Sequence, residues 1–353
     1  MNIENKVIQA LKTVDDPDLK KDLVTLNMIK DLKINDNIIN FTLELTTPVC
    51  PLKDLIKNNC IKAIKKYVSS DFSININITS RITSNKSNIQ ILPKIKNIIA
   101  IASGKGGVGK STVTSNIAIS LASSGAKVGI LDADISGPSI PILFNCQNEK
   151  PEFLEIDGKN YIIPIEQYGI KLMSIGFVAN EENAVLWRGP MASSAIRQFL
   201  LDTSWGELDY LFIDLPPGTS DIHLTLVQTV KITGVLIITT PQKVAIIDAV
   251  KGLAMFEQKK INVPIIGILE NKSYFSTEDF PDKKYYIFGK DGGKFLAKRK
   301  NIPFLGQIPI IQNIRESGDI GYPISMKYNS NAAKIFTNIS SFLSQQIAII
   351  NTK

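Results

Sequence analysis

A glycine-rich stretch starting at Gly104 has the composition and spacing of a phosphate-binding loop. It reads G-K-G-G-V-G-K-S and fits the pattern G-x-x-x-x-G-K-[ST] at every fixed position. Glycines let the backbone turn its N–H groups toward an anion, and a helix beginning at the loop adds a partial positive charge. In this pattern Lys110 reaches the terminal phosphates and the Ser111 hydroxyl ligates Mg²⁺. We therefore predict a site for ATP and Mg²⁺.

The flanking residues fit the strand and helix that such a loop requires. Residues 98–102 form a continuous apolar run, as expected for a strand buried on both faces. After the loop, Val113, Ile117 and Leu121 recur every four residues, and Gly125 is suited to a helix C-cap. The predicted unit is strand, glycine loop and helix.

Two further strand-like runs end in carboxylates. One leads into Asp132 and Asp134, and the other, residues 210–213, leads into Asp214. We place the strand ending at Asp132 beside that of the phosphate loop, and this position favours a functional role for the two carboxylates, since ligands bind at the carboxyl ends of parallel strands. We expect Asp214 to support the Mg²⁺ shell, and Asp134 to orient the attacking water and contribute to the metal site. For the pair at Asp132 and Asp134, turn and cap chemistry is the competing interpretation.

Other polar residues allow more than one role. The N–H group of Gly218, in a stiff Pro-Pro-Gly turn, could sense a γ-phosphate. Asn271 follows a strand and could read a purine edge or form a turn. His223, the only histidine, has no metal or triad partner in the sequence, so we interpret it as structural. Arg188 could contact phosphate or a partner subunit, or pair on the surface.

The three cysteines are Cys50, Cys60 and Cys146, and no two form a C-x-x-C pair. This pattern argues against a disulfide scaffold and fits a reducing compartment. Cys50 directly precedes a predicted helix, whose N-terminal dipole would favour a thiolate. A small buried thiol is the plainer interpretation of Cys50.

Length and composition indicate a globular protein of two domains. The chain has 353 residues, 44% of them apolar and 21% charged. The net charge of +7 comes from scattered lysines without a basic stripe, so we expect no nucleic-acid partner. No signal-peptide core or apolar run of roughly 20 residues is present, so we expect a soluble cytoplasmic protein without membrane attachment.

The order of elements predicts a parallel α/β domain from residue 97 onward, preceded by a small α+β domain. In the large domain, apolar runs alternate with helical patterns, which indicates βαβ units. The expected strands are residues 98–102, 127–131, 170–175, 210–214, 235–239, 265–269 and 304–306. Residues 1–80 predict an α-β-β-α-β unit with helices near residues 3–14 and 52–68. Residues 81–96 are polar and interrupted by a proline, as in a linker.

The complete motif set resembles a known family. With Lys105 as its second residue, the loop resembles the deviant Walker A loop of the SIMIBI-type P-loop NTPases, which include the ParA/MinD proteins and Mrp-type iron–sulfur cluster carriers. The strings D-x-D-x-x-G-P-S, W-R-G-P-M, D-x-P-P-G-T and E-N-x-S-Y resemble the Mrp/ApbC branch. The T-T-P-V-C-P segment before residue 52 resembles an iron–sulfur assembly domain.

The resemblance implies a slow ATPase that acts as a homodimer. It implies that Lys105 reaches the phosphates across the dimer, that iron–sulfur scaffold proteins and apoprotein clients are partners, and that a [4Fe–4S] cluster is handled. The expected catalytic residues are Lys105, Lys110 and Asp134, and the expected Mg²⁺ residues are Ser111, Asp134 and Asp214. The residues expected to bind the nucleotide are Gly104, Lys105, Gly106, Gly107, Val108, Gly109, Lys110, Ser111, Thr112, Gly218 and Asn271.

One departure leaves the cargo open. Many Mrp-type carriers place C-x-x-C shortly after the string that begins at Glu270, whereas residues 274–282 hold no cysteine. A thiolate-bridged cluster needs sulfur ligands, for which Cys50 is the candidate in this chain. The alternatives are an accessory ATPase that binds no cluster and a ParA/MinD-like positioning switch. For the switch, the tail from residue 331 to 353 carries only two cations, a poor membrane anchor.

Overall fold

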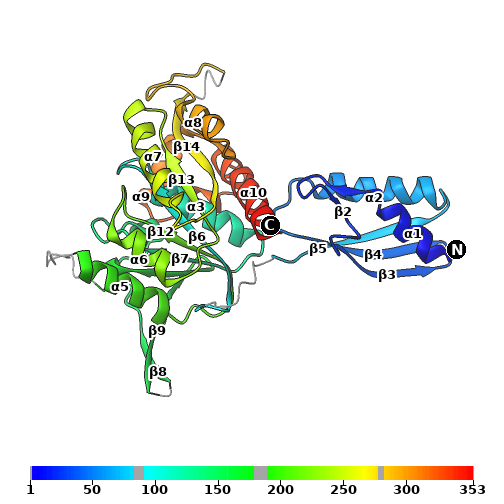
Figure 1. Ribbon diagram of the computed structural model, residues 1–353, viewed down its shortest axis with the longest axis horizontal. Coiled ribbons are helices and arrows are strands. Elements are labelled where there is room, and N and C mark those ends of the chain that lie inside the picture. Colours follow the sequence, from blue (N-terminus) through cyan, green and yellow to red (C-terminus); the bar gives the residue numbers. More distant parts are fainter. Residues whose placement is uncertain (1, 83–90, 157, 179–188, 277–281, 353) are drawn as a thin grey trace.

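The computed structural model describes residues 2–82, 91–156, 158–178, 189–276 and 282–352 (Figure 1). The helices are α1 (Ile3–Leu11), α2 (Lys53–Tyr67), α3 (Lys110–Ser123), α4 (Ile140–Leu143), α5 (Gly189–Asp202), α6 (Asp221–Thr229), α7 (Lys243–Phe256), α8 (Gly292–Lys300), α9 (Gln312–Asp319) and α10 (Asn331–Asn351), with 3₁₀ turns η1 (Ile175–Phe177) and η2 (Ile324–Met326). The strands are β1 (Asp15–Asp16), β2 (Lys21–Asp22), β3 (Ile29–Asn35), β4 (Ile38–Leu45), β5 (Ser73–Ser80), β6 (Ile95–Ser103), β7 (Val128–Asp132), β8 (Phe153–Ile156), β9 (Lys159–Ile162), β10 (Ile165–Gln167), β11 (Ile170–Ser174), β12 (Leu208–Asp214), β13 (Gly234–Thr239), β14 (Ile265–Phe275) and β15 (Phe304–Ile310).

Among the described residues, an eight-stranded sheet runs in the order β10-β11-β7-β12-β6-β13-β14-β15. Its strands are parallel except for the edge strand β10, which pairs antiparallel with β11. The expected parallel α/β sheet is confirmed, with the unpredicted edge strand β10 as its antiparallel exception. The expectation that β7 lies directly beside β6 is wrong, because β12 pairs with both and separates them. The carboxyl ends of these strands still share one edge of the sheet.

Apolar strands and helix faces build a separate core on each side of this sheet. One cluster joins the sheet to Val113 and Ile117 of α3 and Phe336 of α10. The other joins it to Phe199 of α5 and Leu253 of α7. Because every residue from Ile98 to Ala102 is buried, β6 runs through the middle of the sheet and fixes where the phosphate loop leaves it.

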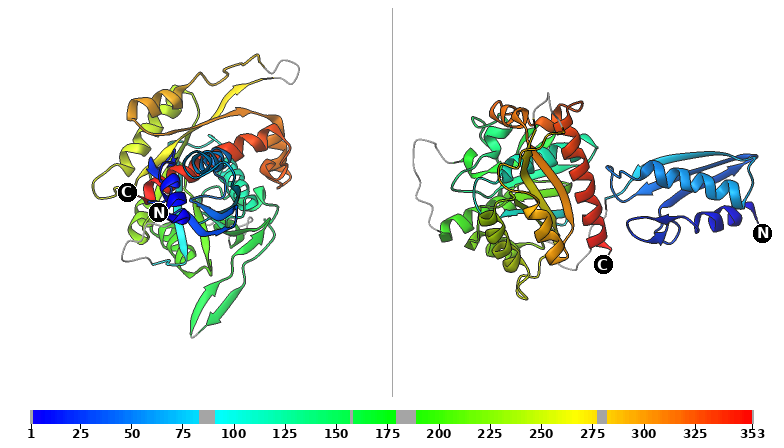
Figure 2. Two further views of the ribbon diagram at one scale, coloured as in Figure 1. Left: turned by 90° about the vertical axis from the view of Figure 1, so that its right-hand side faces the viewer. Right: turned by 90° about the horizontal axis from the view of Figure 1, so that it is seen from above.

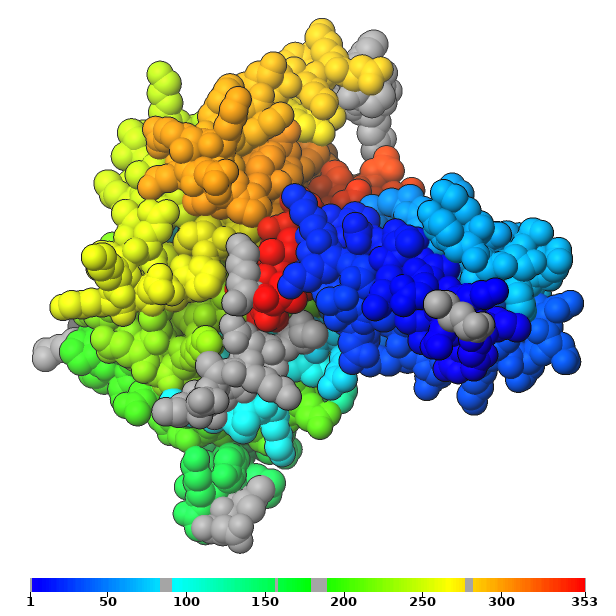
Figure 3. All heavy atoms as spheres, turned by 45° about the vertical axis from the view of Figure 1, so that its right-hand side comes forward, coloured from blue at the N-terminus to red at the C-terminus, as the bar shows by residue number. Residues whose placement is uncertain are grey.

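The N-terminal small domain has its own sheet and core. Strand β4 pairs antiparallel with β3 and parallel with β5. The side chains of Leu11, Leu43 and Ile64 pack together without exposure to solvent. The small domain projects from the body of the protein and meets it beside α10 (Figures 1, 2 and 3).

Some elements differ from expectation. Helix α1 ends at Leu11, because the following residues form the β1–β2 pair and Thr13 Oγ donates to the Ala10 carbonyl oxygen. Strand β14 continues past Leu269 to Phe275. The β8–β9 hairpin and β10 were not predicted, because their strands have only three or four residues. Among the described residues, no helix combines the length and hydropathy needed to cross a bilayer.

Candidate nucleotide site

The glycine loop leaves β6 and enters α3 at the carboxyl edge of the sheet. Gly107 and Gly109 have φ of +80° and +85°, a left-handed conformation that glycine adopts without steric cost. A Cβ atom at Gly104 would lie 2.2 Å from the backbone carbonyl carbon of Asp248 in α7. The loop therefore fits tightly against α7, and Lys110 begins α3.

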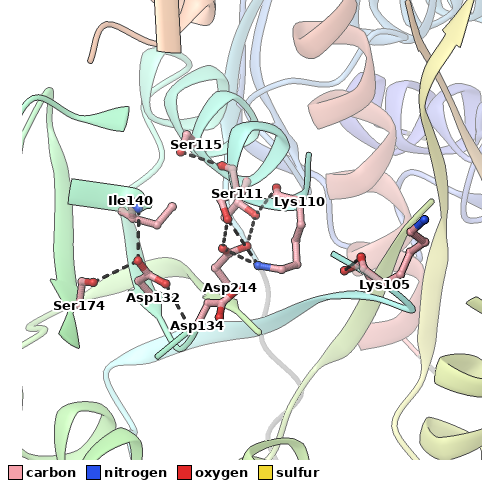
Figure 4. A network of polar contacts seen from close by, with 11 residues as sticks. Lys105, Lys110, Ser111, Ser115, Asp132, Asp134, Ile140, Ser174 and Asp214 are labelled. Carbon is pink, nitrogen blue, oxygen red and sulfur yellow. Dashed lines mark hydrogen bonds and ion pairs between the residues drawn. The ribbon is translucent and has the colours of Figure 1, made fainter. Parts of the chain in front are cut away.

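A buried acid network links the loop to β12. The Asp214 carboxylate accepts from Lys110 Nζ at 2.7 Å and from Ser111 Oγ at 2.5 Å (Figure 4). Its other oxygen accepts from Thr114 Oγ1 at 2.7 Å. Asp214 is fully buried and Lys110 is 6% exposed. The structure therefore brings together three residues that sequence analysis assigned to ATP and Mg²⁺.

Thr114 was not among the predicted site residues. It lies four residues after Lys110, which places both on the same face of α3. That spacing, together with a hydroxyl on an otherwise apolar helix face, is the signal that could have identified it. Its side chain gives Asp214 a third donor, so the buried carboxylate is fully held within the protein.

Asp132 and Asp134 lie beside this network but differ in environment. Asp132 is fully buried and accepts from Ser174 Oγ at 3.0 Å and from the Ile140 backbone N–H at 3.2 Å. Burial and the nearby Asp214 charge raise its pKa to about 7. Asp134 is half-buried and lies close to Asp214 in Figure 4. Burial, and the Asp214 charge to a smaller extent, raises the pKa of Asp134.

These environments separate the two carboxylates by role. Asp132 is occupied with holding β7, β11 and α4 together, as the structural interpretation of this pair expected. The Asp134 carboxylate accepts hydrogen bonds from the Ser136 and Gly137 backbone and is only half-buried, and a raised pKa suits a group that exchanges a proton. Its assignment to the attacking water remains a prediction.

Three other predicted nucleotide contacts have identifiable positions. The Lys105 side chain points away from Lys110 and Asp214 (Figure 4). The N–H group of Gly218 donates to the Ser103 carbonyl oxygen at 2.8 Å, so contact with a γ-phosphate would require this bond to break. Asn271 Nδ2 donates to the Val108 carbonyl oxygen at 2.8 Å, which directs the amide at the loop. Its purine contact remains a prediction.

Within one described chain, the cysteines are not gathered into a metal site. Burial raises the pKa of the Cys50 thiol, and the nearby Asp18 and Asp16 charges raise it further. Cys50 is therefore the small buried thiol of the plainer interpretation, because burial raises its pKa more than the hydrogen bond from the Leu52 backbone lowers it. Burial also raises the pKa values of Cys60 and Cys146 to about 12. Among the described residues, no cluster of three or more His, Cys, Asp or Glu side chains is arranged to hold a metal ion.

His223 is structural in this fold. It is 1% exposed, and its Nδ1 accepts from the Ser220 backbone N–H at 3.2 Å at the start of α6. Burial, together with the Lys110 charge, lowers its pKa to about 4. Arg188 lies outside the described residues.

Comparisons with known proteins agree with this geometry. The sequence model of the ParA family described as NUBPL iron-transfer P-loop NTPase matches residues 94–344, and that of iron–sulfur cluster assembly proteins matches residues 4–77. An iron–sulfur cluster carrier protein of Synechocystis sp. is 44% identical over 346 residues, which is 97% of each chain. The iron–sulfur cluster transfer protein NUBPL of Dictyostelium discoideum is 49% identical over 259 residues, covering 73% of this chain and 78% of that protein.

A solved structure shares the fold. It is a nucleotide-binding protein from Archaeoglobus fulgidus in complex with ADP, with 39% identity and a TM-score of 0.59. The match covers 69% of this chain and 93% of that one.

Proposed function

Because the chain belongs to the family of NUBPL iron-transfer P-loop NTPases and iron–sulfur cluster carriers, we propose that it uses ATP to load or transfer iron–sulfur clusters to apoproteins. The observation that carries the nucleotide part is the convergence of Lys110, Ser111 and Asp214 at the glycine loop. The cluster is the cargo of this reaction, and the apoprotein clients and a scaffold protein are its partners.

The residues present fit Mg²⁺ and a triphosphate. Ser111 Oγ and Asp214 Oδ2 lie 2.5 Å apart, so a hydroxyl and a carboxylate, both oxygen donors that Mg²⁺ prefers, converge beside the loop. Bound Mg²⁺ supplies charge neutralisation at the phosphate oxygens. Lys110 exchanges the Asp214 carboxylate for a phosphate, and Asp214 keeps Ser111 and Thr114 as donors. Asp134 orients the attacking water.

We propose that hydrolysis is slow and requires a second copy of the chain. The Lys105 side chain points away from its own Asp214, which supports a role at a partner's phosphates. With Lys105 acting from the partner, each active site of the homodimer is completed only when two subunits meet. Charge stabilisation at the phosphates is then linked to assembly.

Whether the chain itself binds an iron–sulfur cluster distinguishes a cluster carrier from an accessory ATPase. Cys50 is the candidate cluster ligand, although it is buried with its thiol protonated, so cluster binding requires its exposure. The alternative is an accessory ATPase that acts on clusters held by other proteins.

We also propose that the chain divides into a small domain (residues 1–80), a linker (81–96) and an ATPase domain (97–353). A cytoplasmic location fits its three unpaired cysteines.

Two measurements test the proposal. Lys110→Ala should abolish ATP hydrolysis, because positioning and charge supply most of phosphoryl-transfer catalysis. Its unfolding midpoint is measured alongside, since the variant leaves Asp214 without its cation. Wild-type turnover by a folded Lys110→Ala protein would contradict the nucleotide assignment.

The second measurement is anaerobic reconstitution with iron and sulfide, followed by iron counting, visible absorbance and transfer to an apoprotein. We expect a cluster on the wild-type chain and loss of that cluster in Cys50→Ala. An ATP-hydrolysing chain that binds no cluster would favour the accessory role. Unchanged cluster content in Cys50→Ala would exclude Cys50 as a ligand.

A further inference from the structure

Two consecutive side chains from β14 hold the phosphate loop by its carbonyl groups. Asn271 Nδ2 donates to the Val108 carbonyl oxygen, and Lys272 Nζ donates to the Gly107 carbonyl oxygen, both at 2.8 Å. The two acceptors are successive peptide groups of the loop. Neither bond follows from the phosphate-loop pattern itself, which specifies only residues within the loop.

The backbone of β14 is distorted where these side chains arise. In a regular strand, successive side chains point to opposite faces, so Asn271 and Lys272 could not both reach the same loop. Lys272 instead adopts φ of +55°, an unfavourable conformation for a residue with a Cβ. The pairing of β14 with β15 also changes register between Asn271 and Phe275. The distortion turns both side chains toward the loop, and strain of this kind is typical of functional sites.

Holding a carbonyl oxygen also fixes the direction of the next N–H group. In a planar trans peptide, the C=O of one residue points opposite to the N–H of the following residue. With the Gly107 carbonyl bonded to Lys272, the Val108 N–H faces the other way. The Val108 carbonyl bonded to Asn271 sets the Gly109 N–H in the same manner. These are amides of the kind that cradle phosphates.

We propose that Asn271 and Lys272 form a carbonyl latch, a pair of positioning residues that keeps the Val108 and Gly109 amides ready for phosphate. The latch rests on the phosphate-binding part of the proposed function. The latch gives a positioning role to Lys272, which has no role in the phosphate-loop pattern. It also has the Asn271 amide donate to the loop rather than to a purine base. The space is tight, since a Cβ atom at Gly109 would lie 2.4 Å from Asn271 Nδ2.

The test uses Lys272→Met, Asn271→Ala and, as a matched control, the exposed lysine variant Lys260→Met. Binding of Mg·ATP and of Mg·tripolyphosphate, which has no base, is measured by calorimetry. Loss of one hydrogen bond corresponds to about fivefold weaker binding. We expect each latch variant to lose about this factor for both ligands, and Lys260→Met to match wild type. The loss for Lys272→Met should persist at high salt, where an unpaired charge effect is screened.

Several outcomes would overturn the latch. Wild-type affinity in both latch variants would show that the carbonyl bonds do not prepare the loop. Weaker ATP binding with unchanged tripolyphosphate binding in Asn271→Ala would make that residue a base contact. If the loss of affinity in Lys272→Met disappeared at high salt, Lys272 would act on the phosphates only through its charge at a distance and not through its hydrogen bond to the loop. If the wild-type chain bound neither ligand, the proposed function itself would fail.

Discussion

At the scale of single residues, burial decides which ionisable groups keep their ordinary behaviour. Asp214 is buried together with a cation and two hydroxyl donors. Asp132 is buried beside that carboxylate, and its pKa rises to about 7. His223 is buried with a hydrogen bond from the start of α6, and its pKa falls to about 4. The same cause, desolvation, favours the neutral form of the acid and of the base.

His223 predicts a change of stability with pH. Its pKa is about 4 in the fold and 6.5 when unperturbed, so between these values the unfolded chain binds the proton that the fold rejects. The contribution of neutral His223 to the free energy of unfolding is therefore complete above pH 6.5 and is lost as the pH falls toward 4. His223→Asn keeps an acceptor near the Nδ1 position and does not titrate. We expect wild type to lose about 2 kcal/mol more than this variant between pH 7.5 and 5.

Urea unfolding at several pH values measures this difference. The raised pKa of Asp132 makes its own contribution to stability grow as the pH falls. Because wild type and His223→Asn both retain Asp132, comparing the two proteins cancels this opposite trend. His223→Gln, whose amide corresponds to Nε2 instead, should start lower in stability because the bond to Ser220 is lost. Parallel pH profiles for wild type and His223→Asn would contradict the buried neutral histidine.

At the scale of elements, α10 links the two parts of the chain. Thr47 Oγ1 donates to Ser344 Oγ at 2.8 Å, and Ser341 Oγ donates to the Val49 carbonyl oxygen. The same helix packs against α3, the helix that follows the phosphate loop. These contacts hold the loop that contains Cys50 against α10, and Cys50, which also packs in the small-domain core, is only 8% exposed. Cargo chemistry at Cys50 would require this contact to open.

Breaking the contact should expose the thiol. In Ser341→Ala, we expect a thiol reagent to modify Cys50 several-fold faster than in wild type, as measured by peptide mass spectrometry. Cys60 lies in the same core of the small domain and reports any general unfolding. The control is Thr337→Val, because Thr337 donates within α10 to Ala333. Equal acceleration at Cys50 and Cys60 would show unfolding rather than release of the contact.

At the scale of the whole molecule, the proposed role of Lys105 at a partner's phosphates would connect catalysis to assembly. Lys110 faces Asp214 within its own subunit, whereas Lys105 points away from it (Figure 4). The two lysines of one loop therefore differ in what they can reach. A cis lysine acts in every subunit, and a trans lysine acts only after two subunits meet.

This difference predicts distinct defects. Lys105→Ala should bind ATP with wild-type affinity as a monomer and lose most of its turnover. Wild-type turnover per subunit should rise with protein concentration until the dimer saturates. We expect that rise to disappear in Lys105→Ala. If Lys105→Ala lost as much ATP affinity as Lys110→Ala, Lys105 would instead contact the phosphates bound by its own subunit.

The sequence by itself determined the chemistry that lies close together along the chain. The residues from Gly104 to Ser111, the apolar strand before them and the helix after them are local, so their spacing predicts the loop and the role of Lys110. Asp214 was identified because a buried strand delivers one acid to a sheet edge. The mostly parallel sheet followed from alternating strand and helix patterns, which are likewise local signals.

Only the tertiary structure decided which distant residues meet. It inserted β12 between β7 and β6, and it added Thr114 to the Asp214 network. It turned Asn271 and Lys272 onto the carbonyl groups of the loop through a backbone distortion that no periodicity predicts. It also buried Cys50 in the small-domain core beside α10, and this burial raises the pKa of its thiol. Each outcome depends on packing between segments far apart in the chain, and spacing along a sequence carries no information about that distance.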